Sequence, residues 1–305
     1  MCIRDSGSGP WDVLGALMAT FGLFGVVYGV KHVAGEDALS LGTVVPAGVG
    51  AALLVLFARR QRRRAQPLVD LTMFARPAFG TSVGCIVLAM LALVGLELIA
   101  AQYLQLVLGL TPLETGLRPV SYTHRQVLQR FGPRAMVAAG FVLTAMAVLS
   151  LTVMGREDRP GILVAGFILL GFGLETTLFG AYESMLSEAP AESAGGAAAI
   201  GETSYQLGAG IGIALLGSVM NAAYAPGVGA VPGVPSAAGV AARHSLGEAY
   251  EVADRLGGPA GAALRVAARD SFVHGLHVTL GVSAGLLLLG AVAALRLPRG
   301  LDAGD

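Results

Sequence analysis

Charged side chains are scarce in this chain of 305 residues. They make up 13% of the sequence, about half of the roughly 25% that an ordinary soluble domain carries. Hydrophobic residues make up 54%, and the mean hydropathy is +0.70. This balance predicts an integral membrane protein. The formal net charge is zero, so no overall basic field attracts nucleic acid, and we expect no nucleic-acid partner.

Cysteine is nearly absent as well. Cys2 and Cys85 are the only two, so the sequence offers neither a disulfide framework nor the spacing of a metal site. The opening MCIRDSGSGP lacks the apolar region and the small-residue cleavage site of a signal peptide. MCIRDS and the later PVSYTH at 119–124 resemble peptides that arise when adapter sequence is translated in assembled environmental reads. We therefore interpret residues 1–10 as a non-native leader.

Long apolar runs fill most of the remaining chain. About 20 apolar residues are needed to cross the roughly 30 Å hydrocarbon core of a bilayer. The sequence therefore predicts an all-α fold, a polytopic transmembrane helix bundle with about seven spans. The seven runs lie at 11–30, 41–58, 79–103, 135–154, 161–186, 197–222 and 273–295.

Small residues recur four positions apart within several of these runs. This spacing lets helix backbones approach one another closely in lipid, although it also arises by chance in a sequence with 44 glycines. The pattern predicts close helix contacts at such pairs. The three clearest pairs are Gly25 with Gly29, Gly208 with Gly212, and Gly281 with Gly285.

The distribution of arginine indicates how the chain is oriented. Five arginines lie in ARRQRRRAQ after the second run, and the positive-inside rule places this loop, 59–78, in the cytoplasm. The last run and tail, 272–305, end on the basic LRLPRG, which predicts a cytoplasmic terminus. Residues 223–271 are nearly charge-balanced and broken by Pro and Gly. We predict that they form an extracytoplasmic loop with a short helical hairpin.

The segment 79–134 conflicts with this orientation. A second basic cluster, containing Arg118, Arg125, Arg130 and Arg134, follows the first after a single run. One crossing would place the two clusters on opposite sides of the membrane, which the positive-inside rule disfavours. Within the second cluster, the polar stretch PVSYTHRQVLQ between Arg118 and Arg130 is too short to cross a bilayer. We therefore predict a defective junction at 117–130 from which one helix is missing; a divergent natural loop is the alternative.

Four stretches carry a family resemblance. PLVDLTMFARPAF, AQYLQLVLGLTPLETGLR, RFGPR and SEAPAESAGGAAAIGETSYQLGAGIGIALLGSV follow one another in the chain. In this order they resemble the C-terminal half of the fourteen-span drug:proton antiporters of the major facilitator superfamily, most of all the exporters of quaternary ammonium compounds and methyl viologen. The resemblance implies a partial major facilitator fold. It implies two linker-type helices at 11–58, the ninth helix at 79–103, three helices at 135–222 and one more at the end, with the tenth helix absent.

The resemblance also implies a function. The intact relative would exchange lipophilic cations for protons across the bacterial inner (plasma) membrane by alternating access. The bilayer, the cations and the protons would be its partners, and no cofactor is expected. As written, this fragment is expected to be inactive by itself.

Acidic residues inside or near the runs are the candidates for binding cations or protons, because charged side chains in a bilayer are costly and commonly functional. Glu202 has Tyr205 and Gln206 about one helical turn further on, so the three share a face. Its position also matches the acidic residue of the family's thirteenth helix. The full candidate set is Glu97, Glu175, Glu183, Glu202, Tyr205 and Gln206.

Each assignment has a plainer alternative. Glu97 and Glu183 lie near the ends of their runs and could face water or headgroups, and Glu202 could solvate the cytoplasmic end of its helix. A non-transporting membrane scaffold or accessory subunit is the rival function, and it would need no acids inside the bilayer. The sequence contains no catalytic His/Asp/Glu cluster, phosphate-binding loop or nucleophile elbow, so we do not expect an enzyme.

Overall fold

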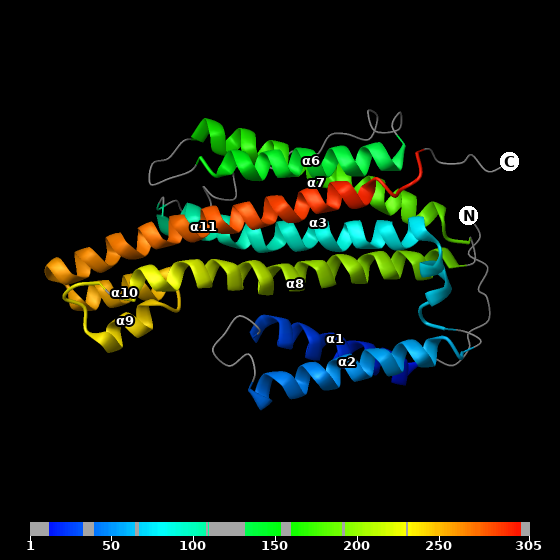
Figure 1. The fold of residues 1–305 in the computed structure, drawn as a ribbon, viewed down its shortest axis with the longest axis horizontal. Coiled ribbons are helices and arrows are strands. Elements are labelled where there is room, and N and C mark those ends of the chain that lie inside the picture. The colour runs from blue at the N-terminus through cyan, green and yellow to red at the C-terminus, as the bar shows by residue number, and fades with distance from the viewer. Residues whose placement is uncertain are drawn as a thin grey trace.

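All regular structure in the described part of the chain is helical. The computed structural model describes residues 12–32, 40–64, 67–107, 109, 132–153, 160–190, 193–229 and 231–299. The predicted all-α fold class is confirmed for these residues (Figure 1). The helices are α1 (Val13–His32), α2 (Leu41–Gln61), η1 (Leu71–Ala75), α3 (Pro77–Gln102) with its π-helical continuation η2 (Tyr103–Val107), α6 (Pro133–Leu151), α7 (Pro160–Ser187), α8 (Ala194–Val228), α9 (Ser236–Ala242), α10 (Leu246–Leu256) and α11 (Gly258–Ala294).

Six of the described helices are long and apolar enough to cross a membrane. They are α2, α3 with η2, α6, α7, α8 and α11, and they correspond to six of the seven predicted runs. The remaining helix, α1, has a shorter apolar stretch, Val13–Gly29. Pro77 and Pro133 open α3 and α6. Proline suits the first turn of a helix because the backbone N–H that it lacks would have no partner there.

Helix α3 is at the centre of the bundle and packs against α7, α8 and α11. Glycines permit the closest of these contacts. A side chain at Gly208 or Gly212 of α8 would collide with the backbone of α3, and one at Gly95 of α3 would collide with the backbone of α8 at Gly212. The predicted contact at Gly208 and Gly212 is therefore confirmed.

The other two glycine pairs have opposite outcomes. Gly25 and Gly29 of α1 approach α2 closely, as predicted, and a Cβ atom at Gly25 would lie 2.5 Å from the carbonyl oxygen of Pro46. The prediction for Gly281 and Gly285 is wrong, because nothing lies within 4 Å of the position that a Cβ atom would take at either residue. The spacing four residues apart repeats on every face of a helix, so it does not show which face meets a neighbour.

Helices α6 and α7 cross at a matched pair of motifs. Gly140 of α6 lies against Gly173 and Thr177 of α7, and Gly173 lies against Gly140 and Thr144 of α6. Each threonine hydroxyl donates to the carbonyl four residues earlier in its own helix, at 2.8 Å for Thr144 and 2.9 Å for Thr177. The two helices therefore approach closely without leaving a buried hydroxyl group unsatisfied.

A buried carboxylate ties α1 to α2. Asp12, just before α1, accepts hydrogen bonds from Arg60 Nη2 at 2.9 Å and from Gln61 Nε2 at 3.1 Å. It also pairs with Arg64 at 3.2 Å. The hydrogen bonds from Arg60 are the main reason that the pKa of Asp12 falls to about 2. Two of the five clustered arginines therefore share one carboxylate within the hairpin, which offsets one of their two positive charges.

The arginine-rich end of α2 and the start of α3 lie at the same end of the bundle (Figure 1). Arg76 at the start of α3 pairs with Glu188 just after α7, at 4.0 Å. Gly180 near the end of α7 packs against Val137 near the start of α6. Both α3 and α6 therefore begin at this end, which the positive-inside rule predicts to be cytoplasmic. The connection that returns from the far end of α3 includes the predicted junction at 117–130, which lies outside the described residues.

The connection between α8 and α11, predicted to be extracytoplasmic and to cover 223–271, is shorter in the structure. Helix α8 continues to Val228 and α11 already begins at Gly258. The reason is that the amphipathic stretch 259–270 extends the last membrane helix instead of forming a separate piece. The short helices α9 and α10 lie between, and the hydroxyl of Tyr224 holds them by donating to the carbonyls of Ala242 and Ser245 at 3.0 and 3.2 Å.

Candidate functional site

Glu202 and Gln206 form a polar pair on α8. The Gln206 amide donates a hydrogen bond of 2.9 Å to the Glu202 carboxylate one turn earlier. Both side chains are exposed, and Tyr205 beside them is half-buried. The opposite face of α8, with Gly201, Ser204 and Gly208, is buried against its neighbours. The sequence-based expectation that the acid and the amide share one face is confirmed.

The structure adds a residue that sequence reasoning missed. Tyr182 of α7 lies over Gly201, where an added Cβ atom would lie 2.6 Å from the tyrosine ring. Tyr182 is within electrostatic range of both Glu202 and Tyr205. Its spacing of seven residues from Glu175 places the two on one helical stripe, and this is the signal that could have identified it.

Glu175 lies on the outward side of α7. It shares its exposed stripe with Ile168 and Phe179, which are 44% and 37% exposed. By helical rise, Glu175 is about 18 Å from the end of α7 and Glu202 about 12 Å from the start of α8. Because α7 and α8 meet at Tyr182 and Gly201 and run in opposite directions, Glu175 lies about 9 Å deeper in the bundle than Glu202. We call Glu175, Tyr182, Glu202, Tyr205 and Gln206 the acidic face.

The remaining two candidates lie elsewhere. Glu183 is half-buried and only four residues before the end of α7. Glu97 is exposed on α3, two residues beyond Gly95, which packs at the level of Gly212 of α8. Helical rise then separates Glu97 from Glu202 by about 18 Å along the bundle. The structure therefore does not bring Glu97 together with Glu202.

The chemistry of the acidic face suits a reversible cation or proton site. Within the described part of the chain, no lysine or arginine forms an ion pair with Glu175 or Glu202. Two carboxylates, an amide and two phenols provide oxygen acceptors and aromatic surface for an organic cation. Among the same described residues, no group of three or more His, Cys, Asp or Glu could hold a metal ion.

Helices of this length and composition, with carboxylates along their outward sides, define a polytopic helical membrane protein. No protein-family profile matches the chain. It is similar to the multidrug efflux pump LfrA of Mycolicibacterium smegmatis, with 30% identity over 301 residues that cover 96% of this chain and 59% of LfrA. It is also similar to the methyl viologen resistance protein SmvA of Salmonella typhimurium, with 32% identity over 252 residues that cover 80% of this chain and 51% of SmvA.

A third similar protein is the tetracenomycin C resistance and export protein of Streptomyces glaucescens, with 28% identity over 305 residues that cover 93% of this chain and 56% of that protein. The expected relationship to multidrug efflux pumps is therefore confirmed. The chain spans between half and three-fifths of the length of these relatives.

Proposed function

We propose that this chain is the C-terminal part of a proton-coupled drug exporter of the major facilitator superfamily, in the bacterial inner membrane. Its substrates would be lipophilic, quaternary ammonium-like cations. The observation that carries the proposal is the similarity to LfrA along 96% of this chain. The similarity to a methyl viologen resistance protein supports a cationic substrate.

The acidic face supports a role within a larger transporter. In major facilitator transporters, two halves enclose a site near the middle of the membrane. Glu175 and Glu202 lie on outward sides of α7 and α8, where a further half could close over them. A carboxylate in such a cavity holds either a proton or an organic cation, because each neutralises the same negative charge. Binding of one then releases the other, which is the coupling that antiport requires.

The proposal includes a defect at 117–130. The relatives are longer than this chain, and α3 and α6 both begin at the arginine-rich end. A helix lost between α3 and α6 would explain why both begin at the same end of the bundle. It would also explain why the basic cluster after α2 and the one before α6 are separated by only one membrane helix. Sequencing the genomic DNA across codons 115–130 tests this part directly. If the genomic DNA there encodes an additional apolar helix, the proposed defect is supported. If it encodes PVSYTH as in the present sequence, the proposed defect is wrong.

Efflux by a completed transporter tests the proposed function. The missing N-terminal half and helix would be supplied from a similar pump, and dye efflux would be measured in inverted vesicles across about pH 6 to 8. Glu202→Gln keeps the side-chain volume but cannot titrate, so we expect it to abolish proton-driven efflux of at least some cations. Glu175→Gln should do so if it faces the cavity.

Glu251→Gln is the matched control. Glu251 lies on α10, outside the spans, and is 75% exposed beside Arg255. Its replacement should leave efflux unchanged. Unaltered rates and pH dependence in both Glu202→Gln and Glu175→Gln would remove the acidic face from the mechanism. A completed protein that inserts correctly but exports no cation would favour the scaffold alternative.

A further inference from the structure

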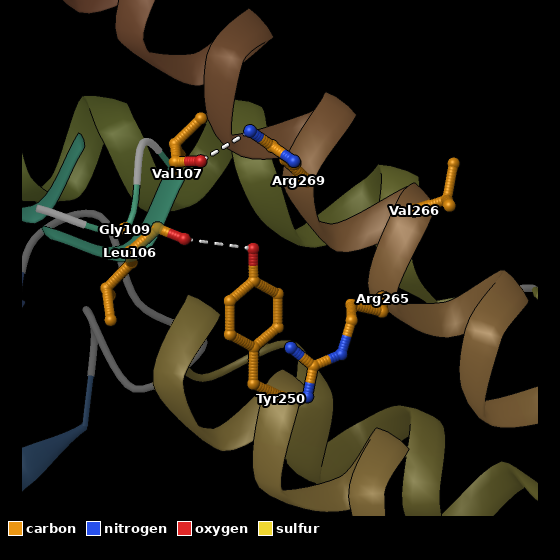
Figure 2. A pocket seen from close by; sticks show the side chains of 7 residues that line it. All are labelled: Leu106, Val107, Gly109, Tyr250, Arg265, Val266 and Arg269. Atoms are coloured by element: carbon orange, nitrogen blue, oxygen red, sulfur yellow. Dashed lines mark hydrogen bonds between the residues drawn. The ribbon is translucent and has the colours of Figure 1, made fainter. Parts of the chain in front are cut away.

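A cavity of about 350 Å³ lies where η2, α10 and α11 meet (Figure 2). This is the end of the bundle opposite the starts of α3 and α6. The walls of the cavity come from three separate elements. Leu106 and Val107 belong to η2, Tyr250 to α10, and Arg265 and Arg269 to α11. Cavities that bind small molecules range from about 300 to 1,000 Å³. This one is therefore large enough for a small ligand or a single lipid headgroup.

Side chains from α10 and α11 fix the position of η2. The Tyr250 hydroxyl donates to the Leu106 carbonyl at 3.2 Å, and the Arg269 guanidinium donates to the Val107 carbonyl (Figure 2). The Arg265 guanidinium lies 4.5 Å from the centre of the Tyr250 ring. Two cationic side chains and a phenol are thus held in place around the cavity before any ligand binds.

The charged side chains that line the cavity are both basic. Its lining includes two arginines and no carboxylate. Asp254 pairs with Arg265 through Nη2 from outside this lining. Burial raises the pKa of Tyr250 despite the two nearby arginines, so its hydroxyl remains protonated and neutral. An anion is therefore the ligand that this charge distribution favours, and the cationic substrates of the proposed exporter would be repelled.

The depth of the cavity narrows the choice of anion. Arg269 comes four residues before the apolar run 273–295, which is about 6 Å along the helix, and Arg265 about 12 Å. The headgroup layer on each side of a bilayer is about 5 to 7 Å thick. Arg269 thus lies at the level of lipid phosphates and Arg265 just outside it. The planar guanidinium group matches the oxygens of a phosphate group.

We propose that this cavity is a phosphate-binding site in which Arg265 and Arg269 hold the oxyanion of an anionic phospholipid headgroup or of free inorganic phosphate. The site is independent of the proposed transport function, because none of its lining residues belongs to the acidic face. Exposed Val266 of α11 lines the opening and provides apolar surface beside the phosphate site.

Lipid titration of the purified 305-residue chain tests the proposal. The chain in neutral detergent would be titrated with phosphatidylglycerol, and the apparent Kd of the first bound lipid measured by native mass spectrometry. Arg265→Gln and Arg269→Gln should each weaken binding about fivefold, since one arginine near the surface contributes about 1 kcal/mol. Arg255→Gln is the control, because Arg255 is 73% exposed on α10 and outside the cavity.

A parallel arm separates the two sources of phosphate. Inorganic phosphate would be added at millimolar concentration, with the melting temperature as readout. If phosphate raises the melting temperature of the parent chain but not that of Arg265→Gln, free phosphate is the ligand. If the arginine substitutions weaken lipid binding but phosphate does not change the melting temperature, a lipid headgroup is the ligand. Arg269 also anchors η2, so Arg269→Lys, which retains the charge, tests the site if Arg269→Gln does not fold. The proposal would be overturned if all variants bound lipid with the same Kd and phosphate did not change the melting temperature. It would also be overturned if Arg255→Gln weakened lipid binding as much as Arg265→Gln and Arg269→Gln.

Discussion

Replacing Gly212 of α8 by alanine should destabilise the bundle, whereas the same change at Gly210 should not. Gly212 lies at the closest approach of α8 to α3, and an added Cβ atom would be 2.3 Å from the carbonyl oxygen of Leu91. Gly210 is two residues away on the same helix, and nothing lies within 4 Å of the position that its Cβ atom would take. The two substitutions therefore add the same atom to a crowded and to an open site.

The expected magnitude follows from the contact distance. Ordinary van der Waals contact begins at 3.4 Å, so the two helices must separate by about 1 Å at Gly212. A gap of roughly 0.5 to 1 Å already loses a quarter to a half of the dispersion attraction between facing atoms. Overpacking of this kind costs typically about 1 to 3 kcal/mol. At Gly210, alanine instead gains up to about 1 kcal/mol through its better helix propensity.

Equilibrium unfolding measures the difference. The purified chain in mixed micelles would be titrated with sodium dodecyl sulfate and followed by circular dichroism. We expect the Gly212→Ala variant to unfold at a lower fraction of dodecyl sulfate than the parent chain, and the Gly210→Ala variant at the same or a higher fraction. Equal midpoints for the two variants would refute the close packing of α3 against α8.

Three further predictions concern the hairpin, the bundle and the isolated chain. The lowered pKa of Asp12 means that the stability it contributes is present above about pH 4 and is lost as the pH falls toward 2; Asp12→Asn should abolish this acid dependence of the melting temperature. Ser283→Ala removes a 2.8 Å hydrogen bond to the carbonyl of Ala92 and should cost about 0.6 kcal/mol in the same micelle titration. Cells that express this chain alone should be no more resistant to quaternary ammonium dyes than vector controls, and reproducible energy-dependent efflux would contradict this.

Much of the fold could be predicted from the sequence because burial in lipid leaves a strong local signal. A bilayer requires about 20 consecutive apolar residues and internal backbone hydrogen bonding. Apolar runs therefore located the six described helices that are long enough to span a membrane, with the largest errors at the ends of α8 and α11. Glu202 and Gln206 could be paired in advance, since residues four apart on a helix are neighbours.

Composition and helical periodicity by themselves determined that this protein is an all-α membrane bundle, and which acids lie within its spans. Only the tertiary structure decided which faces meet. It buried Gly212 but left Gly285 exposed, it placed Tyr182 over Gly201 beside Glu202, and it separated Glu97 from Glu202. It also assembled the arginine-lined cavity from η2, α10 and α11. The reason is physical: apolar sequence is equally compatible with lipid and with a neighbouring helix, so the choice between them depends on close packing of helices distant in the chain.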